Sequence, residues 1–195
     1  MLKDTDIREP LFLYLEGRYG KVRIIEEKTI GKSRADVVMV TEDALTGIEI
    51  KSDADTYTRL KRQVRDYDRI FDYNILVIGS HHAHHAAEHV PAHWGIISAE
   101  WFGDRMDFYE IRPCTRNPKS KPKEKLKLLW RPELSRIQEL NGMHKYKQKS
   151  KAFVIDKIAE CVEPEVLNRQ ISDELFERDY TTIAEEIAEY RQNNR

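Results

Sequence analysis

The sequence predicts an α/β fold, in which helices flank a mixed sheet and a small all-helical unit follows. Three observations support this class. Short apolar, β-rich runs alternate with one long helical pattern in the first 112 residues. The order strand, helix, strand implies that some strands of the sheet are parallel. After a stretch rich in proline and lysine, only helical patterns remain.

The first half of the chain supplies the elements of the sheet. Residues 4–16 are predicted to form a helix because apolar residues recur at helical spacing from Ile7 to Leu15. Pro10 is tolerated only in a first turn, so this helix is expected to begin near Ile7. An amphipathic helix is predicted over residues 55–71. The predicted strands are residues 22–27, 35–40, 46–50, 74–79, 94–98 and 106–111.

These patterns divide the chain into three parts. Residues 1–112 are the expected α/β domain, and residues 113–124 are the expected linker, because prolines and lysines alternate there. Residues 125–195 are the expected helical unit. Its predicted helices are residues 126–140, 152–162, 164–175 and 182–191.

Composition indicates a soluble globular protein of the reducing cytoplasm. Of the 195 residues, 40% are hydrophobic and 34% are charged, which predicts a folded chain with a polar surface. No apolar run is long enough to cross a membrane, and the N-terminus does not resemble a signal peptide. Cys114 and Cys161 lie far apart, so neither a disulfide framework nor a structural zinc site is expected.

Positive charge is concentrated in residues 112–151, although the net charge of the whole chain is −1. This segment holds thirteen Lys or Arg and three Asp or Glu, and both flanking segments are acidic. Such a block favours contact with a polyanion, and a solvated lysine-rich surface is the alternative. The lysines expected to meet nucleic-acid phosphates are Lys145, Lys147, Lys149 and Lys151.

The layout around these lysines loosely resembles a SAP-like DNA-binding motif. A predicted helix ends at Gly142, an extended basic stretch follows, and Ser150 is expected to cap the next helix. Backbone N–H groups at such a helix start also favour anions. A packing or dimerisation module with exposed lysines is the alternative reading of this segment.

A cluster of charged residues in the first half predicts an active site. Glu49 and Lys51 are two residues apart on a strand, so they point to one face of the sheet. Asp36 lies in the preceding apolar strand, and a hairpin through residues 41–45 would bring it beside Glu49. Two adjacent carboxylates repel each other unless a cation lies between them, and Mg²⁺ prefers such oxygen ligands. A structural ion-pair cluster is the alternative.

Asp36 followed by Glu49-Ile50-Lys51 resembles the PD-(D/E)xK nuclease superfamily, which has the restriction-endonuclease-like fold. Gln63 and Tyr67 in the next helix resemble the Q-x-x-x-Y motif of its exonuclease-like branch, whose two residues face the active site. The run from Ser33-Arg34-Ala35-Asp36 to Trp94-Gly95-Ile96 also resembles an uncharacterised bacterial and phage group assigned to this superfamily.

The resemblance implies a catalytic set of Asp36, Glu49, Lys51, Gln63 and Tyr67. Mg²⁺, with Mn²⁺ as a substitute, would be bound by Asp36 and Glu49 and, as a third protein ligand, by the Ile50 carbonyl. Members of the superfamily often add an acid from the first helix. The first choice for that acid is Glu9, followed by Glu16 and by Glu26 on the next strand.

The histidines between His81 and His93 suggest a second, weaker metal hypothesis. On one continuous helix, His81, His85 and His89 would share a face with the spacing of metal ligands. No acid or cysteine completes the set, so exposed histidines without a specific function are the preferred reading.

The expected function is metal-dependent hydrolysis of phosphodiester bonds, with DNA as the expected substrate. A catalytically silent module that binds DNA or a partner protein is one alternative. A nuclease that acts on RNA or on nucleotides is another, because both present the same bond. Oligomeric state stays open, a homodimer included.

Overall fold

A six-stranded mixed sheet forms the centre of the first of two units, Met1–Ser120 and Lys121–Arg195, into which the chain divides. The structure is a computed structural model that describes residues 2–179. Strand order follows the sequence. The strands are β1 (Arg23–Ile30), β2 (Ser33–Val40), β3 (Leu45–Lys51), β4 (Tyr73–Gly79), β5 (Gly95–Phe102) and β6 (Arg105–Arg112).

Both ends of the sheet are antiparallel and its middle is parallel. The pairs β1–β2, β2–β3 and β5–β6 are antiparallel, whereas β3–β4 and β4–β5 are parallel. The two parallel pairs require crossovers, which carry α2 (Leu60–Ile70) and α3 (Ala86–His89). The predicted α/β class, with a mixed sheet flanked by helices and a C-terminal helical region, is therefore confirmed.

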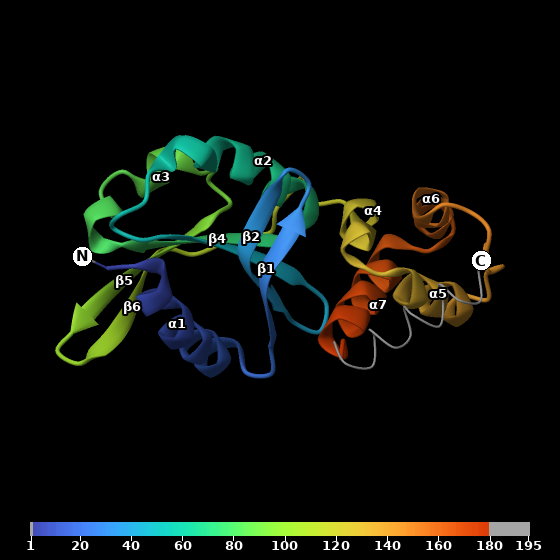
Figure 1. The fold of residues 1–195 in the computed structure, drawn as a ribbon, viewed down its shortest axis with the longest axis horizontal. Helices are drawn as coiled ribbons and strands as arrows, with labels where there is room; N and C mark the ends of the chain where they lie inside the picture. Colours follow the sequence, from blue (N-terminus) through green and yellow to red (C-terminus); the bar gives the residue numbers. More distant parts are fainter. Residues whose placement is uncertain (1, 180–195) are drawn as a thin grey trace. The chain divides into compact units, whose positions relative to one another are not determined.

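The sheet has helices on its two faces (Figure 1). On one face, α1 (Asp4–Tyr19) buries Ile7, Leu11 and Leu15 against strand residues that include Ile48 and Ile50. The opposite face of β3 carries the alternate residues, and α2 packs over it. Residues 2–179 also contain three short 3₁₀ turns: η1 (Tyr57–Arg59), η2 (Ser80–His82) and η3 (Leu126–Leu128).

Gly47 in β3 allows α2 to pack closely on the sheet. A methyl group added at this position would overlap the rings of Phe71 and Tyr67. These rings pack edge-on at 5.2 Å, and Tyr67 also lies 5.3 Å from Trp94. The absence of a side chain at residue 47 therefore brings the site-facing side of α2 close to β3.

The first helix differs from its predicted form. It begins at Asp4 rather than near Ile7, so Pro10 lies inside it. The helix tolerates Pro10 because only one internal N–H is missing while the buried residues Ile7, Leu11 and Leu15 hold the helix on the sheet. The earlier start adds a turn that carries Asp4 and Arg8 on one face.

The segment after β6 differs from the expected free linker. Residues 113–120 belong to the first unit, where the buried Asn117 side chain donates to the carbonyls of Asp68 (2.9 Å) and Phe71 (2.8 Å). Polar contacts thus hold part of the predicted linker on the first unit. Residues 122–125 are helical and belong to the second unit.

The second unit is helical throughout its described part. Its elements are α4 (Pro122–Lys125), η3, α5 (Arg131–Leu140), α6 (Lys151–Cys161) and α7 (Pro164–Phe176). The continuous helix predicted over residues 126–140 is wrong, because the chain is extended at Trp130. A helix running through Pro132 would place its ring against the carbonyl of Leu128. The helix predicted over residues 182–191 lies outside the described residues.

Ser150 caps α6 as predicted, since its hydroxyl accepts the Phe153 N–H at 3.2 Å. Gly142 has a φ of 61°, a left-handed conformation that suits the end of α5. No helix in residues 2–179 is long and apolar enough to span a membrane.

Candidate functional site

Asp36 and Glu49 lie side by side on neighbouring strands. The antiparallel register pairs Val37 with Ile48, so the next residues, Asp36 and Glu49, come opposite each other. Both belong to the face that α2 covers, because Ile48 and Ile50 occupy the other face. Lys51 follows Glu49 on that same face. The predicted hairpin and the predicted facing of these strands are therefore present.

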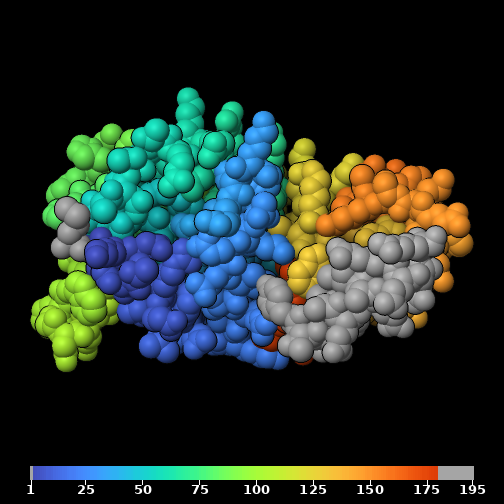
Figure 2. Space-filling view, viewed as in Figure 1, coloured from blue at the N-terminus to red at the C-terminus, as the bar shows by residue number. Residues whose placement is uncertain are grey.

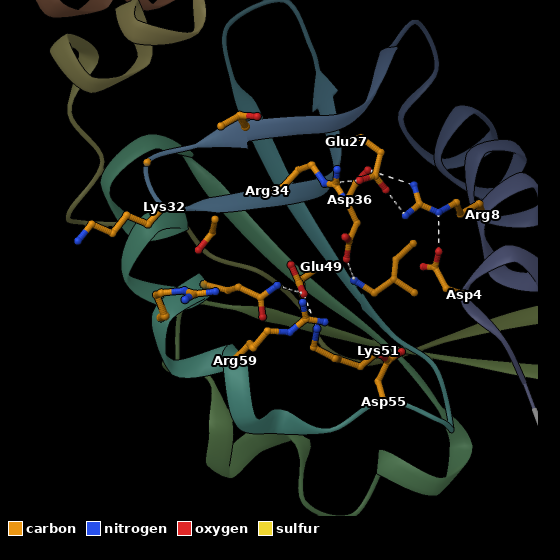
Figure 3. Close-up of a pocket in the computed structure, with 16 residues that line it drawn as sticks. Asp4, Arg8, Glu27, Lys32, Arg34, Asp36, Glu49, Lys51, Asp55 and Arg59 are labelled. Carbon is orange, nitrogen blue, oxygen red and sulfur yellow. Dashed lines mark hydrogen bonds and ion pairs between the residues drawn. The ribbon is translucent and has the colours of Figure 1, made fainter.

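These residues line one cleft, which Figure 3 shows in close-up. Its walls come from the start of α1, from the β1–β2 hairpin, from the end of β3 and from the start of α2. Besides Asp36, Glu49, Ile50 and Lys51, its charged lining includes Asp4, Arg8, Glu27, Lys32, Arg34, Asp55, Arg59 and Arg62.

Glu49 is fully buried and is held by three side chains. Its Oε1 accepts hydrogen bonds from Lys51 Nζ and Gln63 Nε2, and its Oε2 accepts from the Tyr67 hydroxyl at 2.8 Å. Lys51 is itself 4% exposed, so this ion pair lies away from bulk water. Gln63 and Tyr67, four residues apart on α2, thus both reach the carboxylate, as helical spacing predicts.

Tyr67 connects the two strands beneath the carboxylates. Its hydroxyl accepts the Asp36 backbone N–H at 3.3 Å and lies 3.2 Å from the Ile48 carbonyl. Burial, and next the neighbouring Glu49 carboxylate, raise the pKa of Tyr67 well above its usual value of 10. The phenol therefore stays protonated and can donate to Glu49 at every physiological pH.

The carboxylate of Asp36 has far fewer hydrogen-bond and charge partners than that of Glu49. Its Oδ2 accepts the Ile50 N–H at 2.9 Å, and no basic side chain in the described part of the chain pairs with its carboxylate. Burial raises the pKa of Asp36 to about 7, and the nearby Glu49 carboxylate adds to the shift. This carboxylate lacks a cation of its own.

One further buried atom of a residue that lines the cleft has no partner. Gln63 is 8% exposed, and its Oε1 has no hydrogen-bond partner, although its Nε2 is bonded to Glu49. A buried amide oxygen without a donor costs free energy. Asp36, Glu49 and Gln63 together form an oxygen-rich donor set of the kind that Mg²⁺ or Mn²⁺ takes.

The other predicted metal ligands differ in whether they lie at the cleft. The Ile50 side chain packs in the core beneath α1 while its main chain lies at the cleft, so a role for its carbonyl stays a prediction. Glu9 is exposed and does not line the cleft, because it lies about 100° around α1 from Arg8. Asp4 is the acid of α1 that lines it. Glu16 is exposed, and Glu26 pairs with Arg8 at 3.1 Å.

The histidines do not form a ligand set. The continuous helix that would have aligned them is replaced by η2 and the four-residue α3. His82 bonds the Ser52 carbonyl (3.0 Å), His89 stacks on Tyr57 (4.0 Å), and His93 bonds Asp68 (2.9 Å). Within residues 2–179, no group of three or more His, Cys, Asp or Glu side chains could hold a metal ion.

The four predicted nucleic-acid lysines of the second unit differ in their contacts. Lys145 pairs with Glu139 at 2.8 Å, and Lys151 donates to the Lys127 carbonyl at 2.9 Å. Lys149 lies 5.6 Å from the Phe153 ring centroid, and Lys147 is exposed. Two of the four ammonium groups are therefore already engaged within their own unit.

Sequence reasoning missed a charged network at one end of the cleft. Arg8 pairs with Asp4 (2.7 Å), Glu26 (3.1 Å) and Glu27 (2.5 Å), and Glu27 also pairs with Arg34 (2.6 Å). Glu27 has a φ of 52°, which is strained for a residue other than glycine. Only the spacing of Asp4 and Arg8 signalled part of this network in the sequence.

The comparisons with known proteins give a family for the chain. The family model described as "Bacteriophage P4 protein cII" matches residues 6–195. The chain belongs to this family. No match is found among curated proteins.

Two solved structures are similar to part of the chain. A Silicibacter pomeroyi protein of unknown function, SPO1766, is 20% identical over 66% of this chain and 87% of its own, with a TM-score of 0.42. SfsA of Pyrococcus furiosus, solved in complex with Ca²⁺, is 14% identical over 60% of this chain and 63% of its own, with a TM-score of 0.35. At these TM-scores neither likeness supports an inference about activity.

Proposed function

We propose that the chain is a metal-dependent phosphodiesterase of the PD-(D/E)xK type that hydrolyses nucleic acid, with DNA as the expected substrate. The observation that carries the proposal is the unequal compensation of two adjacent carboxylates. Glu49 is bonded to a lysine, an amide and a phenol, whereas Asp36 beside it has a single backbone N–H. An external cation would balance Asp36 and would also give Gln63 Oε1 a partner.

The donor set fits a hard divalent cation. Asp36 and Glu49 would hold it, with oxygens from Gln63 and the Ile50 main chain as further candidates. When bound, the ion supplies a Lewis acid for the phosphoryl oxygen and a more acidic water. The side chains of the protein stabilise the developing charge and orient the metal ligands.

Lys51 places positive charge beside the reacting phosphate. Its ammonium group is fixed by Glu49 and lines the cleft, where it can stabilise the negative charge that develops during hydrolysis. Tyr67 and Gln63 orient Glu49 from α2, which keeps the carboxylate in one rotamer. Their bonds to Glu49 give both residues a positioning role, which for Gln63 comes in addition to its oxygen as a candidate ligand.

A cleavage assay tests the proposal. Purified protein is incubated with duplex DNA, single-stranded DNA and RNA, each with Mg²⁺, Mn²⁺ or EDTA. We expect cleavage that EDTA abolishes and that Asp36→Asn and Glu49→Gln reduce by at least about 10²-fold. Matched controls are Asp43→Asn and Glu42→Gln in the exposed β2–β3 turn, which should cleave like wild type.

Metal binding gives a second readout that does not depend on turnover. Mn²⁺ titration by calorimetry should show a site in wild type and in both control variants, but not in Asp36→Asn. Cleavage that is indifferent to EDTA would show that the two-carboxylate mechanism is wrong. Absence of both cleavage and Mn²⁺ binding would favour a structural ion-pair cluster in a binding module.

A further inference from the structure

Apart from Lys51, which is bonded to Glu49, the positive side chains of the cleft fall into two groups. At the α1 side, Arg8 and Arg34 are tied to acids through Asp4, Glu26 and Glu27. On the other side of Asp36 and Glu49 lie Lys32 and Arg59 (Figure 3). Arg62, one turn along from Arg59 on α2, lines the same cleft. The two sides therefore carry similar numbers of cations, but only those on the α1 side are paired with acids.

The second group forms no ion pair within residues 2–179, although the Asp66 carboxylate lies close to the β1–β2 turn, one turn along α2 from Arg62. Lys32, Arg59 and Arg62 are exposed, and within residues 2–179 none of them forms a hydrogen bond or an ion pair. Asp55, an acid of the lining, has its Oδ2 bonded to the backbone N–H (2.9 Å) and hydroxyl (2.6 Å) of Ser52, and Asp66 accepts the Ser33 hydroxyl at 2.6 Å. The three cations are thus available to an external anion.

Two elements bring these cations together. Lys32 lies in the tight β1–β2 turn, where Gly31 takes a φ of 58° and Ser33 Oγ bonds Asp66 of α2 at 2.6 Å. This bond ties the hairpin to the helix that carries Arg62. The hairpin forms part of the surface of the first unit, where its lighter blue meets the cyan of the α2 region (Figure 2). The backbone segments that carry Lys32 and Arg62 are therefore held together by packed structure.

We infer that Lys32, Arg59 and Arg62 form a phosphate-binding track for a nucleic-acid strand that extends from Asp36 and Glu49 across the start of α2. The proposed reaction places a single phosphodiester at the carboxylates, so three more free cations call for additional phosphates of a polymer. Guanidinium groups bind phosphate oxygens in a bidentate manner, which suits this role. The inference rests on the proposed function, because the phosphodiester site defines where the strand begins.

This inference narrows the substrate class. A nucleotide or dinucleotide would leave most of the track unused, whereas a DNA or RNA strand would occupy it along its backbone. Contacts of this kind give affinity without sequence recognition, because the phosphates are the same in every sequence.

Binding of labelled DNA in EDTA tests the track separately from cleavage. Fluorescence anisotropy with a 20-mer duplex and the matching single strand is measured from 50 to 200 mM salt for the full chain. Arg59→Gln/Arg62→Gln should flatten the slope of log affinity against log salt on duplex by up to about 1.8. The affinity deficit relative to wild type should therefore shrink by about tenfold across this salt range.

A charge-matched control lies on the same helix. Lys61→Gln/Arg65→Gln removes two exposed cations of α2 that do not line the cleft. This pair should keep the wild-type slope. Equal slopes for both double variants, or an unchanged slope for Arg59→Gln/Arg62→Gln, would overturn the track.

Three further outcomes separate the track from its alternatives. Poly-glutamate that displaces DNA equally at the same total charge would overturn the nucleic-acid assignment in favour of an acidic peptide. Wild-type DNA binding that depends on Arg59 and Arg62, without any cleavage, would support the track and refute the proposed activity. Cleavage by wild type with no change in DNA binding in Arg59→Gln/Arg62→Gln would refute the track and leave the activity standing.

Discussion

Asp36 in the first unit and Glu133 in the second show two ways in which a folded chain treats an acid removed from water. Glu133 is fully buried, accepts Arg178 Nε and Nη2 at 2.7 Å each, and also accepts the Trp130 N–H at 2.6 Å. The Arg178 guanidinium lies over the Trp130 ring at 4.1 Å. Asp36 has one backbone N–H and a second carboxylate beside it.

The difference separates a structural charge from a candidate functional one. A buried carboxylate with a bidentate arginine and a further donor has its desolvation offset inside the fold. A carboxylate that lacks such partners costs stability, and a chain retains it where an outside cation completes the site. The following experiments change one member of this comparison at a time.

The largest expected effect is on the compensated pair. Arg178→Met leaves Glu133 buried without its cation and should lower the free energy of unfolding of the second unit by about 3–5 kcal/mol. Chemical denaturation followed by tryptophan fluorescence measures this, because Trp130 packs against Arg178. Arg169→Met, an exposed arginine on α7, is the control and should change stability by less than about 0.5 kcal/mol.

Lys51→Met should come next in size. Turnover should fall by about 10²-fold or more because the positive charge beside the phosphate is lost. Mn²⁺ binding measured by calorimetry should be kept or become tighter, because Lys51 and the metal ion compete for Glu49. Loss of Mn²⁺ binding together with a large drop in melting temperature would instead assign Lys51 a structural role.

A smaller effect is expected when the uncompensated acid is neutralised. The pKa of Asp36 is raised from 3.8 to about 7, so the folded state binds a proton that the unfolded state has released at intermediate pH. The contribution of Asp36 to the free energy of unfolding is therefore most favourable below pH 4 and is lost as the pH rises to 7. In EDTA, Asp36→Asn should therefore stabilise the protein at pH 8 by about 1–2 kcal/mol, a value discounted for partial solvent exposure.

The pH dependence is the control within that experiment. Near pH 4 the two proteins should unfold at nearly the same denaturant concentration, because Asp36 is protonated in the folded wild type. Saturating Mn²⁺ should remove or reverse the advantage of the variant at pH 8. A constant difference at both pH values would show that the substitution acts through packing.

The smallest effect is expected from the basic segment of the second unit. Lys147→Gln/Lys149→Gln should flatten the salt slope of duplex binding by at most about 1.8, and by less if only one lysine contacts a phosphate. Lys145→Gln/Lys151→Gln should change the slope less still, because these lysines are bonded to Glu139 and to the Lys127 carbonyl. Equal effects of the two pairs would contradict this ranking.

The sequence predicted those features of the site that follow from the local periodicity of strands and helices. Alternation placed Glu49 and Lys51 on one face, and helical spacing placed Gln63 and Tyr67 on one side of α2. The apolar run around Asp36 predicted a buried strand, and an acid inside such a strand indicated a functional role. These features depend on residues two to four positions apart, so a single sequence contains them.

What the sequence did not show depends on tertiary placement. Glu9, the first choice for an acid from α1, does not line the cleft, whereas Asp4, which was not among the candidates, does, because α1 begins earlier than Pro10 suggested. The pairing of Arg8 with Glu27 joins a helix to a strand through a left-handed residue that no local pattern signals. Lys32 and Arg59 come from separate elements, and only the packed hairpin and helix bring them to one cleft.

Gly47 has a consequence for finding related proteins by sequence. The glycine allows the Tyr67 and Phe71 rings to pack on β3, and through Tyr67 it governs whether α2 can hold Glu49. An acid followed by E-x-K is a degenerate signature, but a chain that positions its carboxylate as this one does also needs a glycine two residues before the glutamate. A query that combines G-x-E-x-K with Q-x-x-x-Y-x-x-x-F should therefore select chains built in this way and reject chance occurrences of the shorter pattern.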